Sequence, residues 1–252
     1  MLENLRLRAR YESQLQAARS LEALYHNQTS FADLDVRYAQ TDTIFDSTGL
    51  SYIDYEMVRG MHLKRDERGH LCFEHLQAKL LPFDSRVIDR VFWECASREE
   101  FRKHHGVYQV RLATEDTILT KMVDPLQLPH AETMTLTICT AMKRFIESDR
   151  VVAVWEALVT TSGSVSMQLR ESGWNILRPT SARIPHHTGP MSIIQTCVRI
   201  VPELQHAYSE QDLAVGTLTN LIVGSYHRHK EMMHQVSEDL LVTQFDMFHI
   251  SK

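Results

Sequence analysis

Apolar residues recur with a helical period over the C-terminal part of the chain. At 100° per residue, eight side chains within residues 209–242 fall within about 60° of one direction. Ser209 and Asp212 have the spacing of a helix cap. The pattern predicts one helix of roughly 50 Å, a length suited to lying across a broad sheet. Its apolar face comprises Leu218, Leu221, Ile222, Ser225, His229, Met232, Val236 and Leu240.

Two helical patterns also open the chain. Residues 3–26 place leucines near heptad positions, and a second helix is expected from Ser30 to about Phe45, ending near Gly49. We group residues 1–48 as an N-terminal helical leader. Three heptads are barely enough for a coiled coil. Homodimerisation or docking of a protein partner through residues 1–27 is therefore one hypothesis.

Between these ends, apolar and polar residues alternate in the manner of strands. Asp84 or Ser85 is expected to begin one short helix, and residues 186–190 to form a loop. Glu115-Asp116 indicates a tight turn, whereas Asp124-Pro125 is expected to break the pattern. The predicted strands are 55–64, 70–81, 107–114, 117–123, 134–146, 151–160, 165–177 and 191–201.

A turn at residues 147–150 predicts which side chains share a face of the sheet. Symmetric pairing about it places Met142 opposite Trp155 and Arg144 opposite Ala153. Lys143 and Glu156 then lie on the other face as diagonal neighbours that could pair. The first face is expected to point toward the long helix. It contains Ile138, Thr140, Met142, Arg144, Val151, Ala153, Trp155, Ala157 and Val159.

This order of elements predicts an α+β fold, a helix-grip arrangement in which a curved antiparallel sheet is packed by the long C-terminal helix. The 252 residues are 43% hydrophobic and 23% charged, which is typical of a soluble globular protein. The sequence has no apolar run of about 18 residues and no apolar core of a secretory signal peptide near Met1. We therefore expect no stable membrane insertion, and a cytoplasmic or nuclear location. A net charge of −5 makes broad nucleic-acid binding unlikely.

The amino-acid sequence of the C-terminal half resembles the START-like lipid-binding superfamily, and most closely the START-like, mating-associated proteins expanded in oomycetes. The stretches that carry the resemblance are residues 149–155 (DRVVAVW), 169–174 (LRESGW) and 194–202 (IQTCVRIVP), with residues 3–8 (ENLRLR) resembling the helical leader of that group. The resemblance implies a START-like domain over residues 49–252. It also implies that a lipid or sterol-like molecule binds in a cavity between sheet and C-terminal helix.

Several residues are candidates for lining that cavity. Arg144 could anchor a polar head group, or simply be solvated beside its turn. Trp155 and Trp174 are candidate lining residues, with an ordinary core role as the alternative. Arg170 and Glu171 are adjacent, so only one of them can point inward, and spacing alone does not choose between them. Arg170 is retained as a candidate.

Ser225, His229 and Met232 lie on the apolar face of the predicted C-terminal helix and are further candidate ligand contacts. The alternative for His229 is a core histidine bonded to a backbone carbonyl or water. His227, Glu231 and His234 have a spacing that could hold a metal, but they fall on the predicted solvent face, so no metal site is assigned.

Catalytic motifs are lacking. The chain has no GxSxG elbow, no phosphate-binding glycine loop and no dinucleotide fingerprint, so no cofactor is assigned. Cys72, Cys95, Cys139 and Cys197 lack metal-ligand or disulfide spacing and are expected to be reduced. The sequence thus predicts non-catalytic binding of a hydrophobic small molecule. The alternatives are an interaction scaffold acting through the N-terminal helix, and a cyclase-like enzyme with His229 as acid or base.

Overall fold

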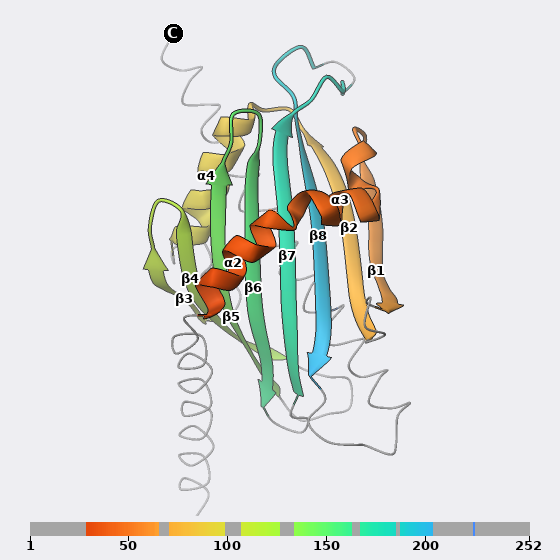
Figure 1. The fold of residues 1–252 in the computed structure, drawn as a ribbon. Helices are drawn as coiled ribbons and strands as arrows, with labels where there is room; N and C mark the ends of the chain where they lie inside the picture. The colour runs from red at the N-terminus through yellow and green to blue at the C-terminus, as the bar shows by residue number, and fades with distance from the viewer. Residues whose placement is uncertain are drawn as a thin grey trace, which may run out of the picture.

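An eight-stranded antiparallel sheet dominates the computed structural model, which describes residues 29–65, 71–98, 107–126, 134–162, 167–184, 187–203 and 224. In spatial order the strands run β1-β2-β8-β7-β6-β5-β4-β3 (Figure 1). All seven pairs of neighbouring strands are antiparallel. The strands are β1 (Met57–Arg65), β2 (Leu71–Leu81), β3 (Val107–Ala113), β4 (Thr117–Leu126), β5 (Met134–Ile146), β6 (Val151–Ser162), β7 (Met167–Pro179) and β8 (Ser192–Glu203).

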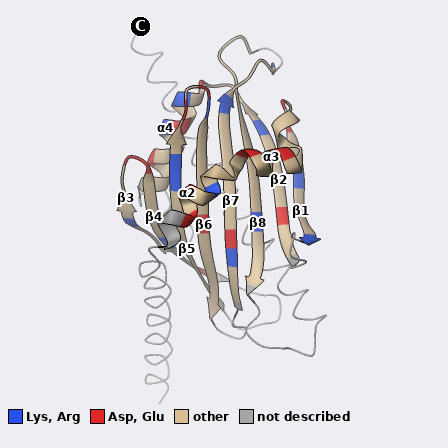
Figure 2. Cartoon of the chain, in the orientation of Figure 1, with Lys and Arg blue, Asp and Glu red and all other residues tan. Residues whose placement is uncertain are grey.

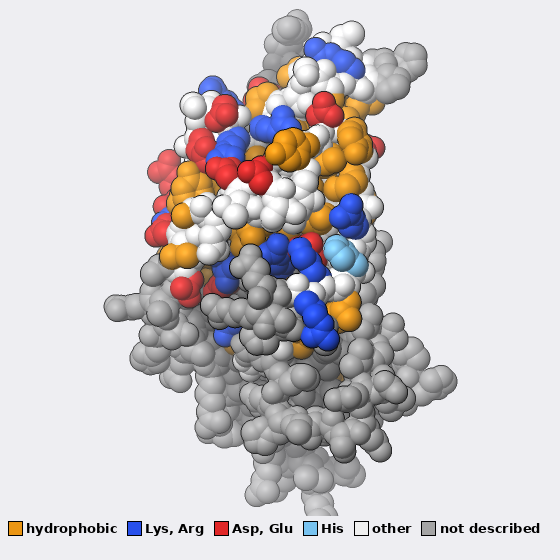
Figure 3. Space-filling model, turned by 45° about the vertical axis from the view of Figure 1, so that its right-hand side comes forward, with side chains coloured by type: hydrophobic (Ala, Val, Ile, Leu, Met, Phe, Trp, Pro, Cys, Tyr) orange, Lys and Arg blue, Asp and Glu red, His pale blue; other side chains and the backbone are white. Residues whose placement is uncertain are grey.

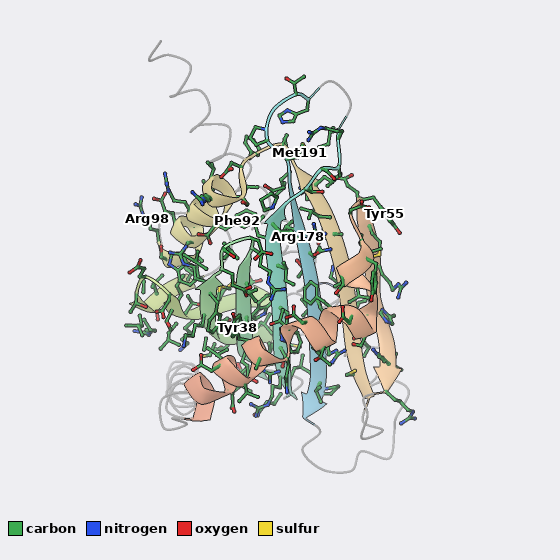
Figure 4. The ribbon with its side chains drawn as sticks, turned by 45° about the horizontal axis from the view of Figure 1, so that its top comes forward. Tyr38, Tyr55, Phe92, Arg98, Arg178 and Met191 are labelled. Atoms are coloured by element: carbon green, nitrogen blue, oxygen red, sulfur yellow. The ribbon has the colours of Figure 1, made fainter. Side chains whose placement is uncertain are left out.

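Helices cover parts of both faces of this sheet. Helices α2 (Thr29–Ala39) and α3 (Thr41–Thr48) cross one face, followed by the short helix η1 (Leu50–Tyr52) (Figure 1). Helix α4 (Ser85–Ser97) packs on the opposite face at one end of the strands. We call these two surfaces the α2 face and the α4 face. The view in Figure 4 separates them, with Tyr38 on α2 and Phe92 on α4.

The α2 face is held by an apolar core and by ion pairs. Its buried side chains from the helices and η1 are Leu34, Phe45 and Leu50, which pack against Leu76, Ala141, Val152, Val154, Trp174, Ile176 and Cys197 of the sheet. Arg37 pairs with Glu156, Asp35 with Lys143 at 2.7 Å and Asp42 with Arg150 at 2.6 Å. Figure 2 shows these charges of both signs where the helices cross the strands. The described part of the predicted leader is therefore packed on the sheet.

Local sequence explains where two of the helices begin or end. Asp84 caps α4, because its carboxylate accepts a hydrogen bond from the Arg86 amide at 2.9 Å, as expected for a helix beginning at Asp84 or Ser85. Gly49 ends α3 in the left-handed region with φ 80°, where glycine carries no steric penalty. The single helix expected from Ser30 to Phe45 is instead divided at Gln40 into α2 and α3.

The predicted register of the central hairpin is confirmed. Met142 pairs with Trp155 and Arg144 with Ala153, about the turn closed by the Glu147 amide and the Arg150 carbonyl. Lys143 and Glu156 lie on the opposite face as expected. However, each has a partner on α2, because that helix lies directly over them.

One strand boundary was predicted wrongly. The pattern was expected to break at Asp124-Pro125, yet β4 continues to Leu126, with Pro125 opposite Thr135 of β5. Among the described residues, the pairing of β3 with β4 ends at Val123, so β5 is the one strand there that pairs with β4 at Pro125. A proline is tolerated there because its missing N–H can face away from the ladder.

The predicted C-terminal helix lies outside the described residues, apart from Gly224, which is helical. Residues 1–28 also lie outside them, so the coiled coil, the dimer and the boundary between residues 48 and 49 stay predictions. Within the part of the chain that the structure describes, no helix is long and apolar enough to cross a membrane.

We predict that Arg37→Met destabilises the fold by about 1–3 kcal/mol, because it leaves the buried Glu156 carboxylate without its partner. Urea unfolding measures this change. Arg37→Met combined with Glu156→Met should recover most of the loss, since no charge is then left buried. Lys143→Met is the control, because its partner Asp35 is largely exposed and the expected loss is about 0–1 kcal/mol. Equal losses for Arg37→Met and Lys143→Met would contradict this account.

Candidate functional site

Trp155 and Gly173 form the centre of the α4 face. They are directly opposite each other on β6 and β7. The Trp155 indole lies across the glycine so closely that a Cβ on residue 173 would be 2.0 Å from the indole carbons Cε2 and Cζ2. The missing side chain therefore lets the indole lie over β7, where its Nε1 donates a hydrogen bond of 2.7 Å to Glu171 Oε1.

The Glu171 carboxyl is the acidic group of this centre. Glu171 is flanked across the strands by Ala157 and Ile200. Burial raises the pKa of its carboxyl, and the hydrogen bond from Trp155 opposes that shift only in part. The apolar cluster on this part of the face comprises Phe73, Met134, Leu136, Val159, Leu169, Val198 and Ile200, with Met61, Ile138 and Trp155 packed against it.

A polar row crosses the α4 face between this apolar cluster and α4. Strand pairing aligns Gln77 on β2, Thr196 on β8, Asn175 on β7, Ala153 on β6 and Arg144 on β5. The side-chain oxygen of Asn175 is buried, and no hydrogen-bond partner for it occurs among the described residues. An unpaired buried acceptor is unusual, and it marks a position where an additional donor would be stabilising.

Arg144, at the end of this row, connects α4 to the sheet. Its guanidinium donates hydrogen bonds to Asp89 of α4 at 2.8 Å and to the Glu115 carbonyl at 2.9 Å. It also lies 4.3 Å from the ring centroid of Trp93. Burial raises the pKa of Asp89, although the Arg144 charge opposes this. In this structure Arg144 therefore joins α4, β5 and the turn between β3 and β4.

The structure separates the sequence-predicted site residues between the two faces. Arg144 and Trp155 lie on the α4 face. Trp174 lies on the α2 face, where it is buried and its indole donates to the Arg37 carbonyl at 3.1 Å. Arg170 lies on the α2 face as well and is exposed. Trp174 and Arg170 are thus not brought together with Trp155.

This alternation places Glu171 on the α4 face with Trp155 and Arg170 on the opposite face, so which of the two contacts a ligand stays a prediction. Sequence reasoning did not select Glu171, Gly173 or Asn175. Symmetric pairing centred on residue 164 would have placed Gly173 opposite Trp155, as the structure does. Ser225, His229 and Met232 lie outside the described residues, so their roles stay predictions.

The α2 face carries a separate charged cluster around the buried carboxylate of Glu74. Arg199 at 2.8 Å, Lys64 at 3.2 Å and His62 at 3.6 Å surround it. Burial favours a raised pKa for Glu74, but Arg199 and Lys64 outweigh it and hold the pKa below its usual value. Figure 3 shows basic side chains gathered with a histidine on the surface of this side of the molecule.

Metal ligands and reactive thiols are not apparent in the described ranges. No group of three or more His, Cys, Asp or Glu side chains there is placed to hold a metal ion. Cys72, Cys95, Cys139 and Cys197 are buried, and none of them forms a disulfide. Burial raises the pKa of Cys197 to about 12, so this thiol stays protonated at neutral pH. The metal alternative at His227, Glu231 and His234 falls outside these ranges.

Comparison with known proteins identifies structural similarity alone. No family model matches the chain, and no curated protein matches it. A STAR-related lipid transfer protein from Xanthomonas axonopodis is 12% identical with a TM-score of 0.38, over 71% of this chain and 99% of that one. An uncharacterized protein from Rhizobium leguminosarum is 9% identical with a TM-score of 0.31, over 72% and 99%.

A third similar structure, a protein from Rhizobium loti, is 12% identical with a TM-score of 0.31, over 60% of this chain and 94% of that chain. At these identities and TM-scores the similarities assign no ligand and no site residue. The function has to be argued from the α4 face itself.

We predict that Gly173→Ala destabilises the protein by about 1–3 kcal/mol, because the new methyl group would overlap the Trp155 indole. Urea unfolding followed by circular dichroism measures the loss. Gly60→Ala is the matched control, since a Cβ at residue 60 on β1 would meet no atom within 4 Å. In a Trp155→Ala background the cost of Gly173→Ala should largely disappear. A cost that persists there would show that the indole is not the obstacle.

The pH dependence of stability offers a second test of this centre. With its pKa raised, folded Glu171 keeps its proton at pH values where the unfolded chain has lost it. Its contribution is therefore complete at acidic pH and is lost as the pH rises through the folded pKa. Glu171→Gln should lack this loss and gain stability relative to the wild type as the pH rises above the ordinary pKa of a glutamate, as urea unfolding over a series of pH values would measure. Parallel stability profiles would contradict the raised pKa.

Proposed function

We propose that the α4 face binds one hydrophobic small molecule, lipid-like or sterol-like, without catalysing a reaction. One observation carries the proposal: a carboxyl and an unsatisfied amide oxygen, Glu171 and Asn175, lie within a mainly apolar sheet face. Binding sites for apolar ligands combine extensive apolar lining with a few polar groups that orient the ligand. Trp155, lying between these two residues, provides a broad aromatic surface for an apolar body.

The proposed ligand lies between the α4 face and the C-terminal segment. Ser225, His229 and Met232 are proposed contacts from that segment, because the sequence pattern assigns them to the apolar side of a helix. Arg144 is proposed to border the site, since it fixes α4 beside the polar row. Burial of apolar ligand surface would supply about 25 cal/mol per Å², before the cost of association.

Native mass spectrometry of freshly purified protein, followed by organic extraction, is the first experiment. We expect one apolar molecule per chain to be retained and to be identified in the extract. Nile red fluorescence then tests the site directly. Ala153→Trp should reduce Nile red affinity about tenfold or more, because a large side chain at this partly exposed position of the α4 face would occupy the space of the ligand.

Thr135→Trp is the matched control for Ala153→Trp. Residue 135 is also partly exposed on β5 but belongs to the α2 face, since it is an even number of positions from Lys143. This variant should bind Nile red as the wild type does. Equal binding by the wild type and both variants would exclude the α4 face as the binding site.

A further inference from the structure

Two oxygen acceptors on β7 constrain the chemistry of the ligand at the site proposed above. Glu171 accepts one hydrogen bond from the Trp155 indole through Oε1, and its second carboxyl oxygen accepts none from the described residues. Asn175 presents a buried oxygen that also lacks a donor there. Four residues along a strand separate the Cα atoms of Glu171 and Asn175 by about 13 Å, and the indole of Trp155 lies over Gly173 between them.

The charges around Glu171 also constrain which ligand group can lie beside it. Within the described part of the chain, burial and the Trp155 indole are the influences on the pKa of its carboxyl, and no cationic side chain there contributes. This differs from the buried Glu74 and Glu156 on the α2 face, which are paired with basic side chains. A negatively charged ligand group beside the ionised carboxylate of Glu171 would meet a like charge, with no cation among the described residues to compensate it.

We infer that the ligand carries a hydrogen-bond donor, either a hydroxyl or a protonated amine, that bonds to Glu171, and that carboxylate ligands are rejected. This inference rests on the proposed function, because it concerns the polar end of the same hydrophobic molecule. The apolar body of the ligand extends over Trp155 toward the polar row. Asn175 accepts a hydrogen bond from a second donor where the ligand carries one at its far end.

A matched series of head groups tests this selectivity. Tetradecylamine, 1-tetradecanol and myristate share one chain length and differ at the head group, and each competes with Nile red for the full-length protein at pH 7. We expect the amine and the alcohol each to compete at least about tenfold better than myristate, a difference of about 1.4 kcal/mol. The amine should be the stronger of the two, since its hydrogen bond to the carboxyl is charge-assisted.

Glu171→Gln tests whether the selectivity between head groups depends on this residue. The amide can still accept a bond from Trp155 but carries no charge, so the three competitors should then differ by less than about threefold. Glu94→Gln is the control, because it also removes one carboxylate but from a partly exposed position on α4. This variant should keep the wild-type order of the three competitors. If a variant does not fold, the order in which the three compounds compete for the wild-type protein still tests the inference.

The outcomes separate the two proposals. If all three compounds compete equally with the wild type, or if myristate competes best, the head-group inference is wrong while hydrophobic binding stands. If Nile red and all three compounds fail to bind, the proposed function fails, and the inference fails with it. An unchanged order of preference in Glu171→Gln would overturn the assignment to Glu171.

Discussion

Strand alternation in a sheet buried on both faces is the constraint on which the rest of this structure depends. Neighbouring residues on a strand point to opposite faces, so a slip of one residue would exchange the two cores. The two tryptophans illustrate this. Trp155 lies on the α4 face over Gly173, whereas Trp174, the next residue after that glycine, is buried beneath α2. The same alternation sends Arg170 and Glu171 in opposite directions.

The two faces differ in how they compensate buried charge. On the α2 face, Glu156 has Arg37 as its partner and Glu74 has Arg199 and Lys64. These carboxylates are neutralised by the protein itself, as the burial of an ionised group requires. That face is therefore built for closure by helices that belong to the fold.

The α4 face has a different polar character. The partner of Glu171 is a neutral indole, and burial favours the protonated form of its carboxyl. Arg144, the basic residue of the polar row, is committed to Asp89 and to the aromatic ring of Trp93. Positive charge is thus used to position α4, while acceptor oxygens are left in the middle of the face. A face that keeps acceptors inside an apolar surface is suited to a ligand that brings its own donor.

Several features followed from the sequence alone, because they depend on periodicity and on local geometry. Alternation located the strands, the Glu147–Arg150 turn set the register between β5 and β6, and Asp84 marked the beginning of α4. Trp155 was correctly placed on the face that also holds Met142 and Val159. In each case the determining residues are close in sequence or are related by a single short turn.

Tertiary structure decided what joins distant segments. The partners of Lys143 and Glu156 come from α2, more than one hundred positions earlier in the chain, and Arg144 meets Asp89 and Trp93 of α4. No local pattern reports such contacts, because they depend on how separate elements pack across a completed sheet. The sequence alone determined that Arg170 and Glu171 point to opposite faces of the sheet. Only the assembled sheet decided that Glu171 lies beside Trp155, because the pairing of β6 with β7 and the elements that cover each face are set by tertiary packing.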